Sequence, residues 1–145
     1  MEREQRAAVV AEAKEWLGTK YHHNASLKGV GTDCAGLPFQ VYRAAGLLPA
    51  DMVLPAYSPQ WHLHRSEEQY ADRVLEYARE IEQVDLGDGD LILWKWGRTF
   101  SHGGIVVGPD LVIHAYIDTG VQLDNIKIHP ELSWRPMRFF SLWGR

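Results

Sequence analysis

The only cysteine of the chain, Cys34, is the residue that could carry nucleophilic chemistry. It follows Asp33, a residue type that often caps a helix, and it precedes an apolar stripe typical of a helix that ends at Gly46. A thiol at the start of a helix lies at the positive end of the helix dipole. This position, beside a histidine, can lower its pKa into the range of about 3.5–7.5. The alternative is a small, buried apolar residue, so a nucleophile is predicted only if a histidine reaches Cys34.

Two of the seven histidines, His102 and His114, flank a predicted hairpin. If residues 108–110 form its loop, the pairing centres on Pro109 and places His102 opposite Tyr116. Side chains alternate along a strand, so His114, two residues from Tyr116, points to the same face as His102. This placement fits a nucleophilic cysteine, a base at position 102 and an orienting residue at position 114. Two polar side chains on a sheet surface are the alternative interpretation.

Helical and strand patterns occupy different parts of the chain. Apolar spacing predicts helices over residues 7–17, from residue 33 or 34 to residue 46, and from residue 66 to residue 81, the last with the spacing of a capping box. Segments rich in β-branched and aromatic residues predict strands over residues 91–96, 104–107, 111–116, 121–126 and 138–143. Helices first and strands second indicate an α+β fold with an antiparallel sheet.

Length and composition narrow the class of protein. The 145 residues fit a single domain, 1–145, that contains a Pro-rich loop and helix over residues 47–84. With 23% charged residues and a formal net charge of −4, no binding to nucleic acid is expected. No apolar run approaches the roughly 18 residues of a membrane span. The first six residues are too charged for a secretory signal peptide, so we expect synthesis in the cytoplasm without one.

Histidine pairs and an acidic turn raise the question of a metal site, which we do not expect. His22 and His23, like His62 and His64, are interpreted as solvated loop histidines, since a catalytic zinc needs three ligands and an open position. Residues 85–90 fit a turn before a strand better than a cation loop. A single cysteine excludes an internal disulfide and a Cys-rich metal site. No metal ligands are therefore predicted.

Four segments, in this order along the chain, resemble the NlpC-type cell-wall cysteine peptidases. Residues 31–37 resemble the Asp-Cys-Ser-Gly-Leu signature, and residues 89–92 resemble a Gly-Asp-Leu strand opening. Residues 101–108 resemble a Ser-His-Val-Gly-Ile segment, and residues 112–115 resemble the strand that supplies the third polar residue. The stretch 21–34 and the insert 47–84 resemble the phage branch of this family, whose members are encoded with tail genes.

The resemblance implies a papain-like α+β fold with N-terminal helices packed on a C-terminal antiparallel sheet. The implied reaction is amide hydrolysis in the stem peptide of peptidoglycan, usually between D-γ-glutamate and a diamino acid, without a cofactor. Carried over by position, Cys34 is the nucleophile, His102 is the base and then the acid, and His114 is the orienting residue. Tyr21 matches a tyrosine near the oxyanion site, and Asp33 is expected on the same oxyanion and substrate side. Other phage tail proteins are the implied partners, and a virion tail is the implied location.

Three departures from the family pattern keep other functions open. Ala35 replaces the usual serine, and Tyr21 lies one residue further from Cys34 than the commonest spacing. Pro38 stands where an aliphatic residue is usual and cannot bond the carbonyl of Cys34, so the helix begins a residue or two later or has a distorted first turn. The alternatives are a non-catalytic virion tail-tip module, and an amidase or acyltransferase that uses the same Cys–His pair.

Overall fold

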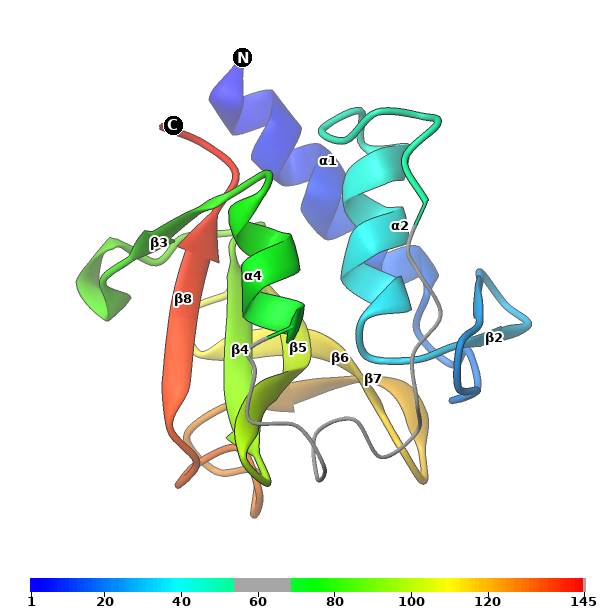
Figure 1. Ribbon diagram of the computed structural model, residues 1–145, viewed down its shortest axis with the longest axis vertical. Helices are drawn as coiled ribbons and strands as arrows, with labels where there is room; N and C mark the ends of the chain where they lie inside the picture. Colours follow the sequence, from blue (N-terminus) through cyan, green and yellow to red (C-terminus); the bar gives the residue numbers. More distant parts are fainter. Residues whose placement is uncertain (54–68, 145) are drawn as a thin grey trace.

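The structure is a computed structural model that describes residues 1–53 and 69–144 (Figure 1). In these residues the α-helices are α1 (Glu2–Glu15), α2 (Gly36–Ala44) and α4 (Gln69–Leu75). A two-stranded sheet pairs β1 (Ser26–Leu27) with β2 (Gly31–Thr32). A short 3-10 helix, η1, covers Gln83–Asp85. Among the described residues, no helix combines the length and the apolarity that crossing a bilayer requires.

The larger sheet has six antiparallel strands in the order β3-β8-β4-β5-β6-β7. Their bounds are β3 (Arg79–Ile81), β4 (Leu91–Trp96), β5 (Thr99–Gly108), β6 (Leu111–Tyr116), β7 (Gly120–Asn125) and β8 (Met137–Ser141). The helices pack on one face of this sheet, as the contacts of α1, α2 and α4 with β5 show. The predicted α+β fold, with helices first and an antiparallel sheet second, is confirmed.

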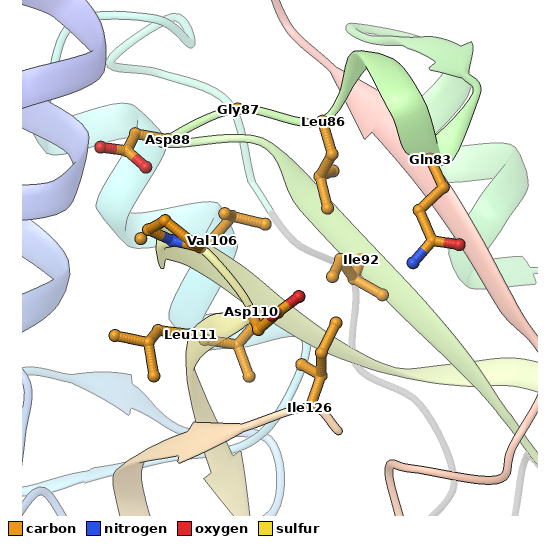
Figure 2. A pocket seen from close by; sticks show the side chains of 12 residues that line it. Gln83, Leu86, Gly87, Asp88, Ile92, Val106, Asp110, Leu111 and Ile126 are labelled. Atoms are coloured by element: carbon orange, nitrogen blue, oxygen red, sulfur yellow. The ribbon is translucent and has the colours of Figure 1, made fainter. Parts of the chain in front are cut away.

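The sheet separates two apolar cores. Leu91, Leu93 and Ile105 face the helices and belong to the main core. Alternation along the strands sends Ile92 and Trp94 to the opposite face, where a smaller core forms. A pocket of about 280 Å³ opens on this second face, with apolar strand residues at its base and polar residues of the flanking turns at its edge (Figure 2).

Two predicted helix bounds are wrong by five residues or more, each for a physical reason. The first helix starts at Glu2 rather than at residue 7, because residues 2–6 are strong helix formers without an apolar stripe. The third was expected to reach residue 81 but ends at Leu75, and Arg79–Ile81 pairs with β8 instead. Tertiary pairing along the sheet edge thus overrides the local helical spacing. The capping-box residues 66–68 and residues 54–59 of the expected loop 47–59 lie outside the described residues.

Candidate active site

The thiol of Cys34 contacts the backbone of strand β5 at the two residues that flank His102. Its Sγ donates a hydrogen bond to the carbonyl oxygen of Ser101 at 3.3 Å, and the backbone N–H of Gly103 hydrogen-bonds the sulfur. The hydroxyl of Tyr21 also forms a hydrogen bond with the thiol. The structure therefore brings the predicted nucleophile to the predicted oxyanion residue and to the strand that carries the predicted base. Among the described residues, no hydrogen bond links the sulfur to the imidazole of His102, whose Nε2 contacts His114.

Asp33 fixes the turn that presents Cys34. Its Oδ1 accepts the backbone N–H of Gly36 at 2.7 Å, and its Oδ2 accepts the N–H of Asn24 at 2.7 Å. The regular helix then begins at Gly36, after the expected start at residue 33 or 34, and Pro38 falls in its first turn. This is the later start that Pro38 offered as one of two alternatives. Asp33 is buried at 1% exposure and holds the backbone of the turn. Its part on the substrate side stays a prediction.

The pKa of the Cys34 thiol is raised rather than lowered. Burial, at 8% exposure, is the largest cause, and the neighbouring charge of Asp33 adds to it, so that the pKa rises to about 12. Hydrogen bonds from Gly103 and Tyr21 act in the opposite direction but are smaller. The expectation of a thiolate stabilised by the helix dipole is therefore wrong for the resting protein, because the cost of desolvating the anion is larger.

The β5–β6 hairpin places His102 and His114 on the same face of the sheet. Gly104 pairs with His114, which is the predicted register. The loop has two residues rather than three, since Gly108 pairs with Leu111, and a bulge just before this pair restores the register. Without the bulge, a two-residue loop would put the two imidazoles on opposite faces. Instead, Nε2 of His102 lies 2.8 Å from Nδ1 of His114, which confirms the same-face prediction.

Asp124 on β7 extends this contact into a directed chain of hydrogen bonds. Nε2 of His114 lies 2.6 Å from Oδ2 of Asp124, which also accepts the side-chain amide of Gln122. A carboxylate only accepts, so Nε2 of His114 carries the hydrogen and its Nδ1 is an acceptor. Nε2 of His102 must then donate, which leaves Nδ1 of His102 with a free lone pair. This is the tautomer that a general base needs.

The imidazoles of His102 and His114 both favour the neutral form. Burial lowers the pKa of His102 well below its usual value, and the positive charge that His114 can carry lowers it further. Burial also lowers the pKa of His114, although its hydrogen bond to Asp124 offsets part of the effect. The resting site therefore holds an uncharged thiol and uncharged imidazoles near pH 7, rather than an ion pair.

His129 is a second histidine near the Asp124 carboxylate. Its Nε2 lies 3.8 Å from Oδ2 of Asp124, and with His114 these residues form the cluster whose spacing could hold a metal ion. However, Nδ1 of His129 accepts the backbone N–H groups of Glu131 at 3.1 Å and Leu132 at 3.2 Å. Nε2 of the neutral ring must then carry the hydrogen and has no lone pair for a metal. The donor set therefore suits a second hydrogen bond to Asp124 better than a metal centre.

Aromatic rings surround the imidazole of His102. The ring centroids of Trp94, Trp96 and Tyr116 lie 5.8, 5.3 and 6.1 Å from it. The guanidinium of Arg135 stacks on Trp96 at 3.5 Å from the ring centroid. This aromatic wall excludes water from the ring, which explains why burial dominates its pKa.

The other candidate ligands take different roles. His22 and His23 lie in the loop before β1, where Nδ1 of His22 contacts the carbonyl of His23 at 3.1 Å. Asp90, at the end of the acidic turn, is buried and pairs with Arg6 at 2.9 Å, so this turn is held by an internal ion pair. Positions 62 and 64 lie outside the described residues.

Fold and site together define an α+β protein in which a thiol in the turn before helix α2 contacts the antiparallel strand that carries the first histidine of a hydrogen-bond chain. Residues 18–134 match the NlpC/P60 family, so the chain belongs to this family. The probable endopeptidase p60 of Listeria grayi is 31% identical over 121 residues, which are 83% of this chain and 20% of that protein. The murein DD-endopeptidase MepS/murein LD-carboxypeptidase of Escherichia coli K12 is 24% identical over 121 residues, 83% of this chain and 55% of that protein. The chain thus spans a fifth to about half of these relatives.

Solved structures share the fold at low sequence identity. NlpC2 from Trichomonas vaginalis has a TM-score of 0.67 at 20% identity over 94% of this chain and 45% of that one. The NlpC/p60 domain of the peptidoglycan hydrolase SagA has a TM-score of 0.64 at 20% identity over 92% of this chain and 96% of that one. RipD from Mycobacterium tuberculosis is described as a non-catalytic NlpC/p60 domain protein. It has a TM-score of 0.60 at 15% identity over 95% of this chain and 97% of that one. Because the fold occurs in proteins described in both ways, activity has to be argued from the side chains of the site.

Proposed function

We propose that this chain is a cysteine peptidase that hydrolyses an amide bond in the peptide stem of peptidoglycan. The observation that carries the proposal is the hydrogen-bond chain from Asp124 through His114 to Nε2 of His102, on the strand that the Cys34 thiol contacts. Its direction leaves Nδ1 of His102 as the base. Membership in a family with relatives named as endopeptidases supports the substrate class. The bond proposed from the family resemblance joins D-γ-glutamate to a diamino acid.

The first half of the reaction forms a thioester. As Sγ of Cys34 attacks the carbonyl carbon, its proton passes to Nδ1 of His102, so that no thiolate has to exist in the resting protein. The backbone N–H of Cys34 and the hydroxyl of Tyr21 stabilise the oxyanion that develops. The His102 imidazolium then gives its proton to the leaving amine as the carbon–nitrogen bond breaks.

The second half returns the enzyme to its starting state. Nδ1 of His102 takes a proton from water, and the hydroxide attacks the thioester carbonyl. The carbon–sulfur bond breaks, the carboxylic acid leaves, and the proton returns to Sγ of Cys34. His114 and Asp124 keep the ring of His102 oriented through both steps and stabilise its charged form. No step requires a cofactor.

A non-catalytic peptidoglycan-binding module is the second candidate. The burial and raised pKa of the Cys34 thiol favour it, as does the likeness to the fold of RipD. The two candidates differ in what Cys34 does, since a binding module keeps its function when the sulfur is removed. The intact His102–His114–Asp124 chain favours the enzyme, because a binding module has no need to fix the tautomer of a histidine on the strand that the thiol contacts.

Digestion of purified peptidoglycan, followed by mass spectrometry of the soluble fragments, tests the proposal. The wild-type protein should release fragments cut within the peptide stem, and Cys34→Ala should release none while it still binds the sacculus. Fragments of equal yield from Cys34→Ala would contradict the role of the thiol. Binding without any fragments from the wild type would favour the second candidate.

The setting of the reaction stays a prediction. We propose a phage tail, with other tail proteins as partners, because stretch 21–34 and insert 47–84 resemble the phage branch. Detection of the chain among the proteins of purified virions would support this setting, and its absence from virions of the encoding phage would contradict it.

A further inference from the structure

The carbonyl group of Cys34, in the turn that leads into helix α2, lacks the backbone partner that its neighbours have. In an α-helix the carbonyl of residue i accepts the N–H of residue i+4, and for Cys34 that residue is Pro38, which has no N–H. The neighbouring bonds of this turn are present, since the N–H of Leu37 reaches the carbonyl of Asp33 at 3.2 Å. The next one, from Phe39, is present as well. The gap therefore lies at the backbone of the proposed nucleophile.

A tyrosine from another part of the chain fills this gap. The hydroxyl of Tyr70, near the start of helix α4, donates a hydrogen bond to the carbonyl oxygen of Cys34 at 2.8 Å. Tyr70 is buried at 7% exposure, where an unsatisfied carbonyl would be costly. The hydroxyl thus takes the place of the backbone N–H that Pro38 cannot supply.

Strand β5 leaves room for this hydroxyl at one position. A Cβ atom built on Gly103 would overlap the Tyr70 hydroxyl, and it would lie 3.0 Å from the ring carbon that bears it. Gly103 has no positive φ angle, so no turn requires a glycine there. Its missing side chain therefore fits the approach of Tyr70 to the nucleophile. Three separate positions, Pro38, Tyr70 and Gly103, are matched to one hydrogen bond.

We infer that Tyr70 is a positioning residue for the nucleophile, which it holds through the peptide group that follows Cys34. Fixing this carbonyl fixes the ψ angle of Cys34 and the first turn of the helix, and with them the direction in which Sγ points. The insert that carries Tyr70 thereby becomes part of the site without touching the substrate. The inference rests on the proposed role of Cys34, but the hydrogen bond itself can be tested independently of turnover.

A double-mutant cycle on Tyr70 and Pro38 tests the inference. Tyr70→Phe removes the donor and should lower kcat on a stem peptide about tenfold with a smaller change in KM. Pro38→Ala restores a backbone N–H at the gap, so Pro38→Ala combined with Tyr70→Phe should recover most of the lost kcat. Pro38→Ala alone should change kcat little. The rate of Cys34 alkylation, measured on the same four proteins, should follow the same pattern.

The outcomes separate the hydrogen bond from general packing and from the proposed function. Tyr77→Phe, which alters another tyrosine packed against the same core, is the matched control and should behave as the wild type. Equal effects of Tyr70→Phe with and without Pro38→Ala would overturn the inference, as would an unchanged kcat and alkylation rate in Tyr70→Phe. If the wild type has no peptidase activity, the alkylation cycle alone decides. If Tyr70→Phe does not fold, recovery of the fold by Pro38→Ala supports the pairing, and no recovery overturns it.

Discussion

Nε2 of His114 lies 2.6 Å from Oδ2 of Asp124, and this contact sets the direction of every hydrogen bond between the carboxylate and the proposed base. The carboxylate can only accept, so each imidazole in turn donates through Nε2. The tautomer of His102 is thus decided on strand β7, two strands away from the strand that carries it.

Asp124→Asn should lower kcat by roughly 10²-fold, because the amide removes the charge that supports the His102 imidazolium. The amide can also donate a hydrogen bond, so the tautomers of His114 and His102 are no longer fixed. Steady-state kinetics on a stem peptide checks this. Asp118→Asn, an exposed carboxylate in the β6–β7 turn, is the matched control and should keep wild-type kinetics. Wild-type kcat in Asp124→Asn would show that the carboxylate has no part in orienting the base.

The alkylation rate of Cys34 should rise with pH and reach no plateau below about pH 10, because burial and the charge of Asp33 raise its pKa to about 12. At pH 7 the native protein should react more slowly than a free cysteine, whose pKa is roughly 8.5. Iodoacetamide labelling followed by intact-protein mass measurement gives the profile. A plateau reached by pH 8 would mean that the resting thiol is ionised after all.

Asp33→Asn should change reactivity and stability in opposite senses. Removing the charge takes away the second cause of the raised Cys34 pKa, so alkylation at pH 9 should become roughly threefold faster. The amide oxygen can still accept the Gly36 N–H, but it cannot also serve the N–H of Asn24 with a second oxygen, and about 1 kcal/mol of stability should be lost. Urea unfolding and alkylation are measured on the same samples. Slower alkylation would contradict the electrostatic part of the account.

The free energy of unfolding should fall as the pH is lowered from about 6.5 to 5. Burial lowers the pKa of His102 and of His114 in the folded state, so the unfolded chain, with imidazole pKa values near ~6.5, binds more protons in this range. Each imidazole should contribute up to about 1.4 kcal/mol per pH unit. In His102→Gln one of these contributions should disappear. Urea titrations at pH 7, 6 and 5 measure the slope, and an equal slope in His102→Gln would rule out this residue as its source.

Local pattern was enough to predict the parts of the site that lie on one hairpin. The alternation of side chains along a strand and a hairpin centred on Pro109 placed His102 and His114 on one face of the sheet. The observed pairing of Gly104 with His114 agrees. The same reasoning could have found Asp124. A turn centred on residue 118 pairs His114 with Gln122, which sets Asp124 diagonally across from His114 on the same face.

The features that the sequence did not predict depend on contacts between distant segments, which no local pattern encodes. The burial that raises the pKa of Cys34 arises only when helix α2 packs on strand β5. The hydrogen bond from Tyr70 joins a helix within the insert to the turn before helix α2. Strand β3 exists because β8 offers its free edge to residues with a helical spacing. In each case the sequence shows a residue type, and tertiary packing decides its environment.

Trapping the acyl-enzyme is the most direct test of the claim that Cys34 is the nucleophile. The protein is mixed with a stem peptide, quenched in acid within the first turnovers and weighed intact. The account predicts an added mass equal to the acyl portion of the peptide, located on Cys34, removed by hydroxylamine and absent from Cys34→Ala. Peptide cleavage by Cys34→Ala at the wild-type rate, with no adduct on the wild-type protein, would contradict it.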